Sequence, residues 1–259
     1  MAGRVLVGTS GYSYDDWRGV LYGPDTRKSD FLQVYASRFA ACELNFTYYR
    51  IPTAKSLWLA VQNSLRRVTF TVKAPGRVTH ERTDVEAACA DLLRALEPMR
   101  EAGVLGAVLA QFPYSFKNTD ESWAYLDRLA ALLAGPPLVV EFRHAGFVTD
   151  ATFSRLRDLG VGFCCVDEPR LRGLMPPVAE ATSDVAYVRL HGRNARDWWE
   201  HEDRDMRYSY LYRREELAEW VGPVRRLSER ARTTFVFFNN HDAGQAVVNA
   251  IEMREMIDA

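Results

Sequence analysis

Cysteine is scarce in this sequence, and its four cysteines do not have the spacing of zinc ligands or of a disulfide framework. Cys42, Cys89, Cys164 and Cys165 include no C-x-x-C pair, and two of them are adjacent. Structural zinc sites and disulfide-rich secreted domains both depend on regularly spaced cysteines. The spacing therefore argues against a zinc site and predicts reduced thiols in a cytoplasmic protein.

The chain also lacks a surplus of charge and a long hydrophobic run. The formal net charge is −1, and no stretch is long and apolar enough to cross a bilayer. The first residues lead into an apolar run at Arg4–Val7, which is typical of a strand and not of a signal peptide. We therefore expect no membrane association. A nucleic-acid partner is unsupported by the net charge, although a local basic pocket is compatible with one.

What the chain does contain is a series of apolar runs that finish in charged or amide residues. Residues 140–143 (VEFR) and 188–191 (VRLH) are two examples. A strand of this kind is buried at its base and available for function at its tip. Since all strands of a (β/α)8 barrel end at the face that holds the active site, the pattern predicts such a barrel. The predicted strands lie near residues 4–9, 41–48, 68–74, 104–112, 137–143, 161–167, 185–191 and 233–239.

Amphipathic helical patterns separate most of these strands, and Asp30 and Thr53 are the expected N-caps of the first two helices. The connection between the sixth and seventh strands contains Pro169, Pro176 and Pro177, which leaves little room for a helix. No repeat or linker divides the sequence, so we expect one domain over residues 1–259. The prediction is an α/β fold: a single distorted TIM-like (β/α)8 barrel whose helix between strands 6 and 7 is short or missing. The other helices are expected near residues 31–39, 84–102, 120–134, 150–159, 213–231 and 242–258.

Alternation along the strands places the polar residues on one face, because side chains two positions apart point the same way. Glu141 and Arg143 share a face, as do Glu43 and Asn45, and this face is expected to point to the barrel axis. Charges there require partners. One interpretation is that Glu141–Arg143 and Glu43–Lys73 are structural ion pairs that plug the barrel. The other is that the whole set forms a functional site, because the polar residues concentrate at one end of the strands.

Several short motifs near the predicted strand ends combine aromatic residues, glycines and charges. They include residues 8–14 (GTSGYSY), 43–50 (ELNFTYYR), 72–75 (VKAP), 111–113 (QFP), 141–144 (EFRH), 189–193 (RLHGR) and 238–240 (FNN). Together these motifs resemble the YecE-like proteins, domain-of-unknown-function family 72, nearly end to end. The resemblance implies a distorted TIM-like barrel. It implies no particular reaction, because the family is named for lacking one and a fold alone does not supply one.

The basic residues at the strand tips suggest anion binding. Arg143, Arg189 and Arg193 have the planar fork that holds phosphate or carboxylate. TIM barrels often bind phosphate with the last two loops and a helix N-terminus. Here Gly244 would let backbone amides approach a ligand, and either Asn240 or Asp242 is expected to cap the last helix. We therefore expect a small anionic ligand; the other expected contacts are Asn45, Tyr49, Gln111, Asn239 and Asn240.

Acid–base groups are available at the same strand ends. Glu43 and Glu141 could face each other and move protons, with Lys73 and His191 as further catalytic candidates. Lys73 could form a Schiff base only if its pKa were lowered. Two neighbouring glutamates are expected to raise that pKa, so this chemistry is not favoured by the sequence.

A metal site is a rival interpretation. Glu141, Asp167, His191, His80 and Glu43 are possible ligands, and metal-dependent barrel phosphodiesterases build their sites from such residues. The chain has only five histidines and no H-x-H or H-E-x-x-H motif. We therefore expect no metal and no cofactor.

The leading hypothesis is an enzyme, a hydrolase or a lyase, that acts on a phosphate-bearing sugar or nucleotide-like molecule. Aromatic residues after the first, second and seventh predicted strands, among them Tyr14, Tyr48 and Tyr208, suit stacking on sugars or bases. The alternatives are a metal-dependent phosphodiesterase acting on DNA and a non-catalytic protein that binds a ligand or partner.

Overall fold

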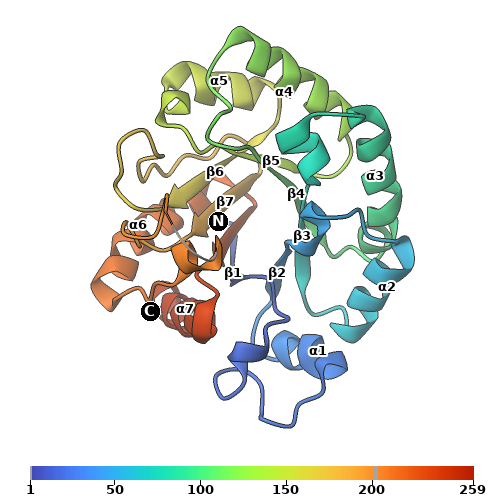
Figure 1. Ribbon diagram of the computed structural model, residues 1–259, viewed down its shortest axis with the longest axis vertical. Helices are drawn as coiled ribbons and strands as arrows, with labels where there is room; N and C mark the ends of the chain where they lie inside the picture. The colour runs from blue at the N-terminus through green and yellow to red at the C-terminus, as the bar shows by residue number, and fades with distance from the viewer. Residues whose placement is uncertain (1, 201–203) are drawn as a thin grey trace.

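The computed structural model describes residues 2–200 and 204–259, and its centre is a closed barrel of eight parallel strands in sequence order. The barrel closes where β8 pairs with β1, from Arg4 opposite Thr233 to Thr9 opposite Phe238. Figure 1 shows the strands at the centre and the helices around them. The strands are β1 (Arg4–Ser10), β2 (Ala41–Leu44), β3 (Thr69–Lys73), β4 (Leu105–Gln111), β5 (Leu138–Glu141), β6 (Gly162–Asp167), β7 (Val185–Leu190) and β8 (Thr233–Phe238). The predicted TIM-like barrel is confirmed.

A ring of helices covers the outside of the barrel, with one interruption. The helices are α1 (Phe31–Ala36), α2 (Ala54–Asn63), α3 (Val85–Glu101), α4 (Asp120–Leu132), α5 (Asp150–Asp158), α6 (Arg214–Arg230) and α7 (Gln245–Asp258). Residues 168–184, which join β6 to β7, contain no helix and run as an irregular loop (Figure 1). The predicted distortion between strands 6 and 7 is therefore confirmed.

Two predicted element boundaries were too generous, for local backbone reasons. β2 ends at Leu44 because Asn45 has helical dihedral angles and begins a 3-10 turn, Phe46–Tyr48. α7 begins at Gln245 and not near residue 242, because Ala243 and Gly244 have φ angles of 50° and 75°. Both irregular segments follow a strand at the same end of the barrel, where they contribute to the candidate site.

The two expected N-caps behave differently. The Thr53 hydroxyl accepts a hydrogen bond from the Ser56 amide at 3.1 Å, which satisfies one free donor of α2 as predicted. Asp30 occupies the N-cap position of α1, as predicted, but its side chain makes no capping hydrogen bond. Its carboxylate instead accepts from Arg27 Nε at 2.8 Å.

The barrel interior is filled by side chains from opposite strands, and Gly106 of β4 makes room for one of them. A Cβ at Gly106 would lie 2.5 Å from Cζ of Phe235 in β8 and 2.9 Å from Cγ2 of Thr69. The ring of Tyr187 lies next to Phe235, with 5.9 Å between ring centroids. Aromatic packing therefore fills the barrel near the start of its strands. Solvent can reach the polar residues only from the C-terminal ends of the strands.

The shell between barrel and helices is apolar. All four cysteines are free and buried. In the described part of the chain, no helix combines the length and apolarity needed to span a bilayer.

Candidate functional site

Arg189 lies at the centre of a buried ion network inside the barrel. Its Nη1 donates to Glu141 Oε2 at 2.5 Å, and its Nη2 donates to Glu43 Oε1 at 2.6 Å. Arg189 is 1% exposed, and both glutamates are fully buried. Strands β2, β5 and β7 thus bring one cation between two carboxylates that are far apart in the sequence.

Glu43 receives a second donor from the barrel interior. Tyr187 stands two positions before Arg189 on β7, and its hydroxyl donates to Glu43 Oε2 at 2.6 Å. Burial and the charge of Glu43 raise the pKa of Tyr187 well above its ordinary value, so the phenol keeps its proton. The Tyr187 oxygen also lies 2.7 Å from Thr71 Oγ1 on β3. Sequence reasoning missed Tyr187, although its alternation with Arg189 places it on the same face.

Glu141 also interacts with Arg143 and His191. Arg143 Nε forms an ion pair with Glu141 Oε1 at 2.7 Å. Burial opposes ionisation of Glu141, but Arg143 and Arg189 together hold its pKa well below its ordinary value. Glu43 pairs with Arg189 and not with Lys73, so only the first of the two predicted ion pairs, Glu141–Arg143, is present.

His191 is neutral in this network. Burial and the charge of Arg143 lower its pKa from 6.5 to about 3. His191 Nε2 lies 3.1 Å from Glu141 Oε1, and Nδ1 lies 3.1 Å from the Asn239 Nδ2 amide. Since a carboxylate only accepts and an amide nitrogen only donates, Nε2 carries the proton and Nδ1 accepts from Asn239.

Glu168 is a second residue that sequence reasoning did not select. It follows β6, is fully buried, and accepts from Arg143 Nη1 at 3.0 Å and from the Met175 amide at 2.9 Å. Burial raises the pKa of Glu168 to about 7, against the opposing effect of Arg143. The residue before it, Asp167, takes the opposite direction, as alternation requires, and binds Arg193, Tyr212 and Trp220.

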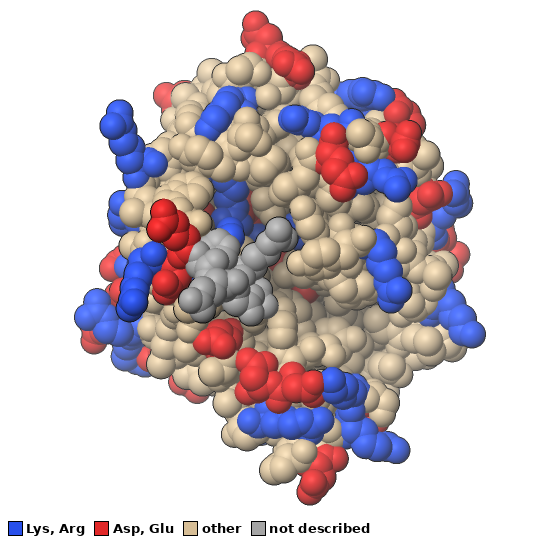
Figure 2. Space-filling view, in the orientation of Figure 1, with Lys and Arg blue, Asp and Glu red and all other residues tan. Residues whose placement is uncertain are grey.

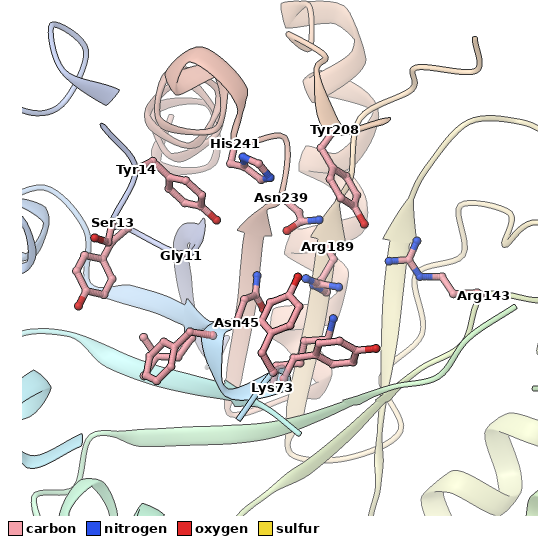
Figure 3. A pocket seen from close by; sticks show the side chains of 15 residues that line it. Gly11, Ser13, Tyr14, Asn45, Lys73, Arg143, Arg189, Tyr208, Asn239 and His241 are labelled. Atoms are coloured by element: carbon pink, nitrogen blue, oxygen red, sulfur yellow. The ribbon is translucent and has the colours of Figure 1, made fainter. Parts of the chain in front are cut away.

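Above this network, at the C-terminal ends of the strands, is a cavity of about 410 Å³. Figure 3 shows side chains from several strand ends and loops around it, and in Figure 2 basic side chains are visible in the central hollow of this face. A volume of this size and a lining of aromatic residues with a few polar groups are typical of small-molecule sites. The lining residues are Gly11, Tyr12, Ser13, Tyr14, Leu44, Asn45, Phe46, Tyr48, Tyr49, Lys73, Arg143, Arg189, Tyr208, Asn239 and His241.

Lys73, the last residue of β3, lines this cavity and has an unusual environment. Its Nζ lies 4.6 Å from the centre of the Tyr48 ring. Burial and the nearby charge of Arg189 lower the pKa of Lys73 from 10.5 to about 7, although Glu141 and Glu43 act in the opposite direction. The expectation of a raised pKa was wrong, because burial and the charge of Arg189 outweigh the two glutamates, which act in the expected direction.

Aromatic rings form the outer walls of the cavity. Tyr14 and His241 are stacked, with centroids 4.7 Å apart and planes 7° from parallel, and Figure 3 shows them together above Lys73. Tyr48 meets Tyr49 edge to face at 5.2 Å, and Tyr49 is 82% exposed at the rim. Such walls suit a flat ring or a sugar face.

The predicted site residues therefore separate into two layers. Asn45, Tyr49, Lys73, Arg143, Arg189 and Asn239 line the cavity, whereas Glu43, Glu141 and His191 lie beneath it as fully buried partners. The remaining predicted residues, Gln111, Arg193 and Asn240, do not line the cavity.

Each of these three has a partner outside the cavity. Gln111 donates to the Phe112 carbonyl at 2.7 Å. Arg193 is held by Asp167 and Glu219. Asn240 donates to the Tyr210 carbonyl at 2.8 Å, which ties the β7 loop to the β8 loop.

The N-terminus of the last helix does not present the expected anion site. Neither Asn240 nor Asp242 caps α7, whose N-cap is Gly244. The Ala243 amide donates to Asp16 Oδ2 at 2.7 Å, so a carboxylate of the chain already lies there. A Cβ at Gly244 would lie 2.9 Å from Val20 Cγ2, so the space beside this glycine is filled by protein.

The predicted metal ligands do not converge. Among residues 2–200 and 204–259, no group of three His, Cys, Asp or Glu side chains is arranged to hold a metal ion. Asp167 points away from the barrel axis and is bound by Arg193. Glu43 and Glu141 are bound by Arg189.

Comparison with known proteins finds a family model that matches nearly the whole chain. The family model described as "Protein of unknown function DUF72" matches residues 6–259. The UPF0759 protein YunF of Bacillus subtilis (strain 168) is 30% identical over 270 residues, which covers 98% of this chain and 95% of the relative.

Two solved structures have the same architecture over nearly their full length. A DUF72 family protein from Thermotoga maritima MSB8 is 41% identical with a TM-score of 0.91, over 98% of this chain and 99% of that one. A DUF72 family protein from Enterococcus faecalis V583 is 25% identical with a TM-score of 0.88, over 99% and 96% of the two chains.

Proposed function

Because this chain belongs to the DUF72 family, whose function is unknown, we propose a function from its cavity: it binds a small anionic metabolite that carries a ring, and it is a hydrolase or a lyase. A phosphorylated sugar or a nucleotide-like molecule has this chemistry. The ligand would lie between the aromatic walls, with its anionic group toward the basic floor.

The observation that carries the proposal is the charge of the cavity lining. Lys73, Arg143 and Arg189 reach the cavity, and none of the described residues that line it is an aspartate or a glutamate. The carboxylates that balance these charges, Glu43 and Glu141, are fully buried behind them. A ligand in the cavity therefore contacts the cationic side chains and not the carboxylates, although the charges of the network nearly cancel.

Arg143 is the arginine best placed to contact the ligand. Its Nε is ion-paired with Glu141 and its Nη1 donates to Glu168, which leaves Nη2 to donate to an anion. Arg189, by contrast, uses both terminal nitrogens on the two glutamates. Asn45 adds a polar contact, because its Oδ1 accepts no hydrogen bond from the described residues.

Calorimetric titration with matched ligands tests this proposal. Ribose 5-phosphate and adenosine monophosphate would be compared with ribose and adenosine, for the wild-type protein and for Arg143→Met. One hydrogen bond to a charged group is worth about 1.5–3 kcal/mol, so the variant should lose about tenfold to a hundredfold in affinity for the phosphorylated ligand. Arg155→Met is the control, since that arginine pairs with Asp127 on the surface.

Two results would overturn the proposal. One is equal affinity for the phosphorylated and the uncharged ligands. The other is phosphate-dependent binding that Arg143→Met leaves unchanged. Consumption of the bound ligand, followed by NMR, then distinguishes a hydrolase or lyase from a protein that only binds.

A further inference from the structure

Lys73 differs from the other charged residues of the site, because it reaches the cavity and pairs with no carboxylate. In the part of the chain that the structure describes, no ion pair and no side-chain hydrogen bond joins Nζ to another group; its contact is the Tyr48 ring at 4.6 Å. Figure 3 shows Lys73 beside Arg189 in the cavity. Lys73 is half-buried, and an amine in such a partly desolvated site without an anion is energetically costly. Groups of this kind gather at functional sites.

The reason Lys73 is unpaired lies in the network below it. Both carboxylates within reach of β3, Glu43 and Glu141, are bound by Arg189 at 2.6 and 2.5 Å. A lysine that lacks its counter-ion and has a cationic neighbour is the arrangement that activates an amine as a nucleophile. The fully buried glutamates, in contrast, cannot touch a ligand in the cavity.

We propose that Lys73 is the nucleophile of this cavity and forms an imine with the carbonyl carbon of an anionic aldehyde or ketone. This inference rests on the proposed function, whose ligand class it narrows to carbonyl compounds. It also selects lyase over hydrolase chemistry, because an iminium draws the electron pair of an adjacent bond toward its nitrogen.

The step balances without any further reactant. The lone pair of neutral Nζ attacks the carbonyl carbon, a C–N bond forms, and the π electron pair of the carbonyl moves to its oxygen. Nitrogen releases its two protons, oxygen takes up two, and the oxygen leaves as water while the C=N bond forms. Nothing is oxidised or reduced.

The protonation state of Lys73 is suited to this step. With its pKa lowered to about 7, about half of the amine is neutral at neutral pH. Arg189 and Arg143 favour the neutral form, and Glu141 and Glu43 favour the charged form. Burial and the charge of Lys73 lower the pKa of the neighbouring His80 to about 4. His80 is therefore neutral at neutral pH and adds no positive charge beside Lys73.

The test uses pyridoxal 5′-phosphate, an anionic aromatic aldehyde, followed by borohydride reduction and peptide mass spectrometry. The chain has four lysines, so each site is resolved: Lys28, Lys55, Lys73 and Lys117. We expect Lys73 to be labelled at least tenfold faster than Lys55 at pH 7. The labelling rate of Lys73 should decrease as the pH is lowered and reach half of its maximum near pH 7. Lys73→Arg should abolish this label, whereas Lys55→Arg should leave it unchanged.

A second probe separates the failure of this inference from that of the proposed function. Propionaldehyde carries no charge, so its reaction measures the reactivity of the Lys73 amine independently of anion binding. Selective labelling of Lys73 by both aldehydes, with no protection by inorganic phosphate, would support the imine and count against the anion site. Binding of phosphate with no selective labelling of Lys73 by either aldehyde would overturn the imine.

Discussion

The guanidinium of Arg189 donates to Glu141 at 2.5 Å, in a position where both side chains are almost entirely removed from solvent. The second carboxylate bound to Arg189, Glu43, makes the arginine a bridge between opposite sides of the barrel. This bridge stabilises two buried carboxylates and at the same time leaves Lys73 without a counter-ion. The stability of the ion network and the proposed reactivity of Lys73 therefore depend on the same arginine.

Replacing Arg189 by methionine should strongly destabilise the barrel. The variant leaves Glu43 and Glu141 buried without their main cation, and breaking a buried ion pair in this way costs about 3–5 kcal/mol. Urea denaturation would measure the free energy of unfolding. Arg155→Met, which removes an exposed ion pair with Asp127, should cost at most about 1 kcal/mol. Equal small losses in both variants would show that the network is not structural.

His191 should make the protein less stable as the pH falls. Its pKa is about 3 in the folded protein against an ordinary value of 6.5, so the unfolded chain binds more protons between these values. Stability from this group is complete above pH 6.5 and decreases toward pH 3, by about 3 kcal/mol between pH 7 and pH 4.

The measurement compares urea denaturation of the wild-type protein and His191→Gln at pH 7 and pH 4. Glu168, with its pKa raised to about 7, changes stability with pH in the opposite direction, but it does so in both proteins. The difference between the two proteins therefore gives the contribution of His191 to the pH dependence of stability. The variant should lose less stability on acidification. Parallel pH dependences would mean that His191 keeps its ordinary pKa in the folded state.

Lys73→Met should stabilise the protein at pH 7, although it removes the proposed nucleophile. The folded state binds the proton of Lys73 more weakly than the unfolded chain does, so this group destabilises the fold; the penalty is complete below pH 7 and disappears as the pH rises to 10.5. Methionine has a similar shape and needs no partner, and we expect a gain of at least about 1 kcal/mol in urea denaturation. Lys55→Met, at an exposed position, is the control for the loss of one charge. A loss of stability at Lys73 would indicate that the lysine is a structural partner of the glutamates.

Gly106→Ala should disturb the barrel interior. The added methyl group would lie 2.5 Å from Phe235 Cζ, and overpacking of this kind typically costs about 1–3 kcal/mol. Phe235→Leu in the same chain should recover part of the loss, since it shortens the side chain in contact. Gly222→Ala, in helix α6 with only a flexible arginine 3.4 Å away, should instead be neutral or stabilising. Thermal unfolding of the four proteins would show whether the contact with Phe235 is the cause.

The barrel could be predicted from the sequence alone, because strand periodicity and polar strand ends are local patterns that do not depend on tertiary information. Most of the cationic lining could be predicted too, since Lys73, Arg143 and Arg189 stand at strand ends. The prolines between β6 and β7 predicted the missing helix for the same local reason.

Which charges meet, in contrast, depends on the packed barrel. Glu43 is 146 positions from Arg189 along the chain, and nothing in the sequence distinguishes this pairing from one with Lys73. The pKa of a side chain depends on burial and on the distances to all nearby charges. At Lys73, burial and the charge of Arg189 outweigh the two glutamates, so the predicted direction of the pKa shift was wrong. The same reasoning explains Glu168 and the last helix. Packing between distant segments decides that Glu168, and not Asp167, points toward Arg143. It also decides that the Asp16 carboxylate lies at the N-terminus of the last helix.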